Sequence, residues 1–205
     1  MDIKLKYYDL SNDNSNADVV IFQKNIAPAY ENLATAWKVI RNCGRSNYHP
    51  FTFPLGLEIN TRDSWGNHTP TLAADYGESY RLTLNPSGNE LVHQGKATNS
   101  REIQVRNDLK RGSMSACIYR DQRLLAIKNI VAPGQMAVFQ FKPSIYIGLA
   151  SQVEEGQTLN SAVLSASFTE LSLFGIASAD IVMTGGGAGP DATPYAFRLE
   201  NVVLI

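Results

Sequence analysis

Short segments in which apolar and polar residues alternate, separated by turn-forming residues, constrain the fold of this chain more than any other feature. Residues 3–8 read Ile-Lys-Leu-Lys-Tyr-Tyr, so the apolar side chains at positions 3, 5 and 7 share one face of an extended chain. Residues 79–84 alternate in the same way and stop at Asn85-Pro86-Ser87-Gly88, a strong turn signal. A period of two is typical of strands that bury one face, so the sequence predicts a β protein.

About ten short strands follow from this pattern, and no linker or repeat divides them. Such spacing, with turn signals between the strands, is typical of sandwiches and jelly rolls. We therefore predict an all-β fold, a single β-sandwich or jelly-roll-like domain over residues 1–205, with Pro54 at a sheet edge or a bulge. The predicted strands are Ile3–Tyr8, Val19–Gln23, Phe51–Phe53, Leu55–Asn60, Ser79–Leu84, Glu90–His93, Ile103–Arg106, Ser115–Tyr119, Leu124–Lys128, Met136–Phe141, Ile145–Leu149, 181–183 and Tyr195–Leu204.

Two segments, 30–40 and 160–174, carry apolar side chains at spacings that fit both a helix and a strand. In the first, strand is favoured for Ala36–Arg41. In the second, the residues of Ala162–Thr169 alternate between small and apolar side chains as in a strand, but the same stretch also fits a helix face. The sequence leaves one short helix open in either place.

The chain is poor in charge, and its few charges are unevenly distributed. Charged residues make up 18% of it, against about 25% in average soluble domains, while 16 Asn, 16 Ser and 11 Thr supply neutral polar groups. Residues 151–205 contain six acidic residues and one basic residue, Arg198, so they carry −5 and the first 150 residues carry +4. The overall net charge of −1 argues against nucleic-acid binding. It favours a homo-oligomer, with the opposite charges meeting either between subunits or inside one sandwich.

The N-terminal sequence contains no apolar stretch of the kind found in secretory signals, and no run approaches the 18 to 20 apolar residues of a spanning helix. We expect a cytoplasmic protein by default, or an extracellular one if it is released or if a signal has already been removed. Cys43 and Cys117 lack metal-type spacing, and two free thiols are favoured over a disulfide.

The motifs of common enzymes are missing from the sequence. There is no Gly-x-Ser-x-Gly nucleophile turn, and His49, His68 and His93 are scattered without the spacing of zinc ligands. The sequence therefore points away from an enzyme and predicts no cofactor and no metal. One enzymatic alternative stays open, a cupin-like metal enzyme in which distant strands bring the histidines and carboxylates together.

A polar loop that carries a tryptophan is the candidate ligand site. Asp63, Trp65, Asn67 and His68 lie within six residues, and aromatic faces with neighbouring amides and carboxylates are the groups that bind sugars. Two nearby aromatic residues could extend the platform, namely Tyr76 and Tyr80. The opposing interpretation, in which Trp65 folds inward and closes one end of the sandwich, is favoured on base rates for a large aromatic residue.

A glycine-rich stretch is the second local feature. Gly185, Gly186, Gly187 and Gly189 precede Pro190, and no Lys-Ser or Lys-Thr pair follows as in phosphate-binding loops. A flexible surface connection is the favoured interpretation. The absence of side chains would also let a ligand or partner approach the backbone closely.

The sequence thus predicts a non-enzymatic binding or interaction protein that self-associates, with carbohydrate binding through the Trp65 loop as a hypothesis. The alternative is a membrane-active, pore-forming protein that uses segment 157–184, whose small and apolar residues alternate. Its expected partners are accordingly a second copy of the chain and either a glycan or a membrane surface, with no nucleic acid.

Overall fold

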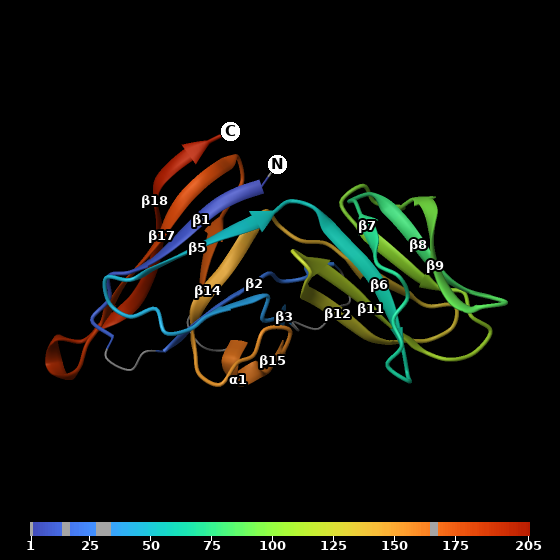
Figure 1. The fold of residues 1–205 in the computed structure, drawn as a ribbon, viewed down its shortest axis with the longest axis horizontal. Helices are drawn as coiled ribbons and strands as arrows, with labels where there is room; N and C mark the ends of the chain where they lie inside the picture. Colours follow the sequence, from blue (N-terminus) through green and yellow to red (C-terminus); the bar gives the residue numbers. More distant parts are fainter. Residues whose placement is uncertain (1, 14–16, 28–33, 165–167) are drawn as a thin grey trace. The chain divides into compact units, whose positions relative to one another are not determined.

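Strands account for most of the chain in the computed structural model, which describes residues 2–13, 17–27, 34–164 and 168–205. Within these ranges the other regular elements are a one-turn helix, α1 (Ser161–Leu164), and a 3-10 turn, η1 (Gly189–Asp191). The prediction of an all-β, sandwich-like fold is confirmed (Figure 1).

The contacts divide the chain into two compact units. Unit 1 comprises residues 1–23, 34–55 and 143–205, and unit 2 comprises residues 24–33 and 56–142. The strands of unit 2 all come from one continuous stretch, whereas those of unit 1 come from before and after it. Such a division occurs both between domains and inside one domain, so the single domain expected from the sequence stays a prediction.

Unit 1 contains two four-stranded sheets. The first has the order β18-β17-β1-β5 and the second the order β16-β14-β2-β4. In the first sheet β1 pairs in parallel with β17, Lys4 lying opposite Ser178, and in antiparallel fashion with β5. The strands are β1 (Asp2–Asp9), β2 (Asp18–Phe22), β3 (Ala34–Thr35), β4 (Lys38–Ile40), β5 (Tyr48–Pro54), β14 (Ser144–Ala150), β15 (Thr158–Leu159), β16 (Thr169–Ser172), β17 (Ile176–Gly186) and β18 (Thr193–Leu204).

The core of unit 1 lies where the alternation places it. In β1 the residues at 3, 5 and 7 are buried, whereas the lysines between them reach the surface. Trp37 is almost fully buried and packs its ring edge-to-face against Phe53, with the ring centroids 5.5 Å apart. Pro54 ends β5 at the edge of its sheet, as predicted, where its missing N–H costs no ladder hydrogen bond.

Unit 2 also contains two four-stranded sheets, of order β13-β10-β8-β9 and β12-β11-β6-β7. Both predicted hairpins form: β8 pairs with β9, and β11 with β12. Fully buried apolar residues such as Ile59, Leu82 and Phe139 make up the core. The strands are β6 (Leu57–Asp63), β7 (Leu72–Ala74), β8 (Glu78–Asn85), β9 (Gly88–Lys96), β10 (Ile103–Asn107), β11 (Met114–Arg120), β12 (Arg123–Val131) and β13 (Met136–Phe139).

Four details differ from the sequence predictions, confirm them or refine them. The described residues contain eighteen strands instead of about ten, because pairs as short as β3 and β15 have too few residues to show alternation. Residues 162–164 are helical in α1, not extended, whereas 165–167 lie outside the described residues. Strand is confirmed within Ala36–Arg41 as β4, and residues 30–33 are outside the description. Both cysteines are free thiols.

Candidate binding site

The turn that carries Trp65 is a tight three-residue connection at the end of β6. The N–H of Gly66 donates to the carbonyl of Asp63 at 3.2 Å, and the N–H of Asp63 donates to the carbonyl of Asn67 at 3.0 Å. Gly66 has a φ of +87°, the left-handed conformation that closes a turn of this kind and that glycine adopts without strain. The local sequence therefore determines the shape of the turn.

The side chain of Asp63 holds the turn together. Its Oδ1 accepts hydrogen bonds from the backbone N–H groups of Trp65 and Asn67, both at 2.9 Å, and its Oδ2 accepts from the Asn67 side-chain amide at 3.0 Å. The hydrogen bond from the Asn67 side chain, followed by those from the backbone, lowers the pKa of Asp63 below its ordinary value. The ionised carboxylate thus fixes the loop that presents the indole.

Trp65 projects into solvent, with 87% of its surface exposed. The interpretation in which it folds inward is wrong. The reason is local, because Trp65 is a central residue of a turn that extends past the end of β6, and side chains at such positions point away from the sheet. A large apolar side chain exposed to this degree, on a turn held by five hydrogen bonds, is a preformed contact point.

A groove of about 660 Å³ lies beside Trp65 and is built by three neighbouring strands of one sheet. It is formed by the ends of β6, β11 and β12, because Ser115 lies opposite Arg62 in the β6–β11 ladder. Ser115 Oγ donates to Asn129 Oδ1 at 3.0 Å across the hairpin. The lining residues are Arg62, Asp63, Ser64, Trp65, Gly66, Ser113, Met114, Ser115, Asn129 and Ile130.

Ile130 lines the same groove in an unusual backbone conformation. Its φ is +55°, a region that β-branched residues rarely adopt, and its side chain is 77% exposed. The strain comes from a bulge: two steps along β11, from Met114 to Ala116, face three steps along β12, from Val131 to Lys128. The bulge turns an apolar side chain outward beside Trp65, so two exposed apolar groups flank the groove.

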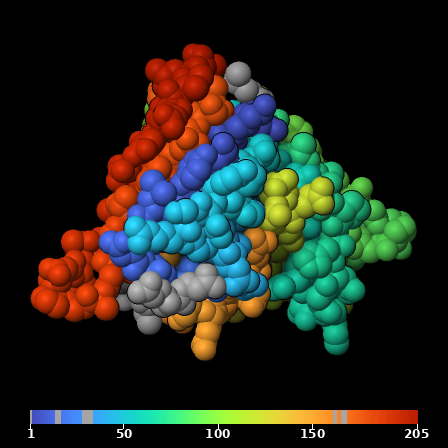
Figure 2. All heavy atoms as spheres, turned by 60° about the vertical axis from the view of Figure 1, so that its left-hand side comes forward, coloured from blue at the N-terminus to red at the C-terminus, as the bar shows by residue number. Residues whose placement is uncertain are grey.

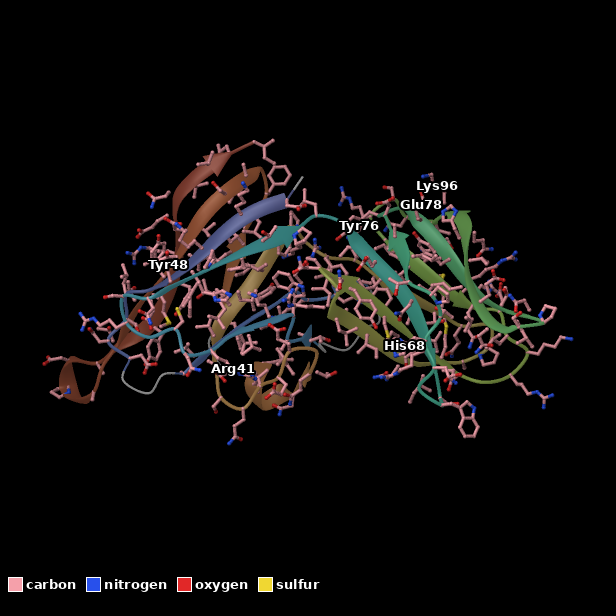
Figure 3. All side chains as sticks on the ribbon, in the orientation of Figure 1. Arg41, Tyr48, His68, Tyr76, Glu78 and Lys96 are labelled. Atoms are coloured by element: carbon pink, nitrogen blue, oxygen red, sulfur yellow. The ribbon has the colours of Figure 1, made fainter. Side chains whose placement is uncertain are left out.

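The remaining residues of the predicted Trp65 site are not brought into this groove. Asn67 and His68 line a separate hollow of about 350 Å³, which Asp63 also lines. His68 Nδ1 lies 3.3 Å from Asn60 Oδ1. Tyr80 is buried, and its hydroxyl donates to the carbonyl of Ala73 at 2.9 Å. Figure 3 shows Tyr76 and His68 well separated along unit 2. The aromatic platform expected from the sequence thus reduces to Trp65.

Tyr76 is paired with a buried arginine instead. Its side chain hydrogen-bonds Arg120, whose residue is almost completely buried. Burial lowers the pKa of Arg120 to about 10, and the interaction with Tyr76 partly opposes that change. Burial likewise raises the pKa of Tyr76. Tyr76 is itself 41% exposed and does not line the Trp65 groove.

The glycine stretch packs against its own chain. A Cβ on Gly185 would overlap the carbonyl oxygen of Pro194, and one on Gly186 would meet the Tyr195 ring. The carbonyl of Gly185 accepts a hydrogen bond from the N–H of Asn12 at 2.7 Å. Gly185 and Gly186 belong to β17, and Gly187 follows it. The close backbone approach predicted for a ligand is made here by β18, so a role toward a ligand or partner stays an untested prediction.

Four findings on the described residues concern the metal-enzyme and membrane-active alternatives. No group of three or more His, Cys, Asp and Glu side chains there could hold a metal ion. His93 Nε2 lies 2.6 Å from Glu78 Oε2, and the His93 ring packs edge-to-face on Tyr80. None of the helices in the same part of the chain is long and apolar enough to cross a membrane. Segment 157–184, proposed for membrane insertion, contributes α1 and three strands, among them β17 in the middle of its sheet.

Six residues of the groove lie outside the Trp65 loop and were not anticipated from the sequence: Arg62, Ser113, Met114, Ser115, Asn129 and Ile130. The predicted hairpin of Ser115–Tyr119 with Leu124–Lys128 does place Ser115 close to Asn129, because the two residues lie at similar distances from the turn along its two strands. The pairing of β11 with β6, by contrast, joins residues about fifty positions apart, and no local pattern signals it.

A scan against protein-family models finds no match for this chain, and searches of the curated proteins and of the solved structures find none either.

Proposed function

We propose that this protein is a non-enzymatic binding protein that recognises a neutral saccharide at the Trp65 groove. The observation that carries the proposal is the 87% exposed indole on a turn held by Asp63. The C–H face of a sugar ring is apolar and weakly positive, so it stacks on the negative face of an indole. Because the turn is fixed before the ligand arrives, little loop entropy is lost on binding.

The rest of the groove supports a neutral ligand with many hydroxyl groups. One cation, Arg62, and one anion, Asp63, line it, so its formal charge is balanced. Ser113, Ser115 and Asn129 add directional donors and acceptors. A concave, partly apolar surface with a few polar groups is typical of small-molecule sites.

Substitution of the indole tests the proposal. A sugar that covers one face of Trp65 buries roughly 100 Å² of it, which at about 25 cal/mol/Å² stabilises the complex by ~2.5 kcal/mol. We expect Trp65→Ala to weaken binding of the best neutral oligosaccharide on a glycan array by about 10- to 100-fold. Trp65→Phe should retain part of the affinity, because a smaller aromatic face remains.

The matched control is Phe174→Ala, which removes another exposed aromatic side chain, one in unit 1 that lines neither groove. It should leave the array profile unchanged. An array on which no neutral glycan binds, or on which Trp65→Ala binds as the unmodified protein does, would contradict the proposal. Self-association and membrane action stay predictions of the sequence.

A further inference from the structure

A second groove lies on the outer face of the first sheet of unit 1. Figure 2 shows this face, on which β18, β17, β1 and β5 run side by side as red, orange, blue and cyan bands. The groove has a volume of about 470 Å³. Outward-facing side chains of three strands line it: Lys4 and Lys6 from β1, Pro50 and Thr52 from β5, and Ser178 and Asp180 from β17. Asn201 of β18 completes the lining.

The groove has a small surplus of positive charge. Lys4 and Lys6 contribute two ammonium groups, and Asp180 contributes one carboxylate, so the surplus is a single positive charge. The Asp180 carboxylate is already engaged, because Asn201 Nδ2 donates to its Oδ2 at 2.7 Å. The next charges on β18, Arg198 and Glu200, bond to each other at 2.6 Å. One anionic group on a ligand would therefore balance the site.

Lys6 is held in position by two tyrosines. Its ammonium lies 5.5 Å from the ring centroids of both Tyr8 and Tyr48, whose rings are themselves 5.5 Å apart. A hydrogen bond with Tyr8 raises the pKa of Lys6 above its ordinary value, so the side chain stays charged. A cation fixed in this way loses little freedom when it binds an anion.

We propose that this groove binds a carboxylated sugar, such as a uronic acid unit of an oligosaccharide. The Lys4 and Lys6 ammonium groups bind the carboxylate, and the hydroxyls of Thr52 and Ser178 pair with sugar hydroxyls. The ring of Pro50, opposite Lys6 in the β1–β5 pair, offers an apolar surface beside Thr52. A polyanion such as nucleic acid does not fit, because its affinity depends on many cations whereas this groove has a surplus of one. The site is separate from the neutral-saccharide site proposed at Trp65.

Titration with a galactose oligomer that carries a single galacturonate unit, followed by amide chemical shifts in NMR and by calorimetry, tests this inference. We expect the amides of Lys4, Lys6, Thr52 and Ser178 to shift, and neutral galactose oligomers to leave them unmoved. The double variant K4Q/K6Q should bind at least about tenfold more weakly. The double variant K110Q/R111Q removes two exposed cations of unit 2 and changes the net charge equally, so it should bind normally.

Equal loss of affinity in both double variants would overturn the proposal, because it would mean that only net charge matters. Shifts produced equally by neutral galactose oligomers would also overturn it. Trp65→Ala separates the two sites, since it should weaken neutral-saccharide binding and leave binding at the Lys4 and Lys6 groove unchanged. The NMR spectrum of each variant verifies that it is folded before its affinity is compared.

Discussion

At the scale of single residues, the conformation of the glycine stretch gives a sharp prediction. Gly185→Ala should destabilise the protein by about 3 kcal/mol or more, because the new Cβ would overlap the Pro194 carbonyl and the φ of +89° is unfavourable for alanine. Gly187→Ala is the matched control. Its φ is +98°, but the nearest atom to its Cβ, on Asn12, is 3.8 Å away, so it should cost only about 1 kcal/mol.

Urea unfolding followed by circular dichroism measures both values. Two glycine variants with the same small loss would show that only the backbone conformation matters, and that β18 does not pack against Gly185 as described. A flexible surface connection, the interpretation favoured from sequence, would show almost no loss at either position.

The fates of two aromatic residues show what the sequence can and cannot predict at this scale. Tyr80 is in phase with Leu82 in an alternating strand, so the pattern itself places both side chains on the buried face. Trp65 lies in a turn, where no period exists and hydrophobicity alone argues for burial. Its exposure follows from the hydrogen bonds of Asp63, whose geometry is visible only once the chain is folded.

At the scale of elements, the stability of the Trp65 turn should depend on pH in a defined direction. Hydrogen bonds to the ionised form lower the pKa of Asp63, so the folded turn binds the proton less readily than an unfolded chain does. The contribution of the Asp63 carboxylate to the stability of the turn is fully present above the ordinary pKa of about 3.9. It is lost as the pH falls through the lower pKa of the folded state.

We therefore expect the backbone amide resonance of Trp65 to move in an acid titration, with a midpoint below about 3.9. Asp63→Asn removes the titrating group while keeping one side-chain acceptor, so its resonance should not show this transition. Persistence of the same transition in Asp63→Asn would show that another group orders the turn.

The pairing of strands marks the limit of sequence analysis at this scale. The β8–β9 and β11–β12 hairpins were predictable, because each is closed by a short turn with recognisable residues. The parallel pairing of β1 with β17 was not, since Lys4 and Ser178 are far apart in the chain and alternation does not specify a partner. The uronate groove depends on that pairing, which is why the lysines of β1 gave no hint of it.

At the scale of the whole molecule, the strands of unit 2 lie in one continuous stretch of the chain, and we predict that this stretch folds alone. Its eight strands all lie between residues 56 and 142 and pair with one another in two sheets. A segment of about 90 residues is long enough to bury its own core. The isolated fragment 56–142 should therefore give a dispersed amide spectrum in NMR and retain the Trp65 groove.

The fragment should nevertheless be less stable than unit 2 in the intact chain. It lacks Asn25, whose side-chain amide donates to the Val138 carbonyl at 2.9 Å and whose Oδ1 accepts from the N–H of Gln140 at 2.9 Å. Extending β13 in this way adds about 1 kcal/mol per hydrogen bond. A fragment whose spectrum is that of an unfolded chain would instead support the one domain over residues 1–205 that we predict from the lack of a linker in the sequence. Urea unfolding of the intact chain should then follow a single transition by every probe.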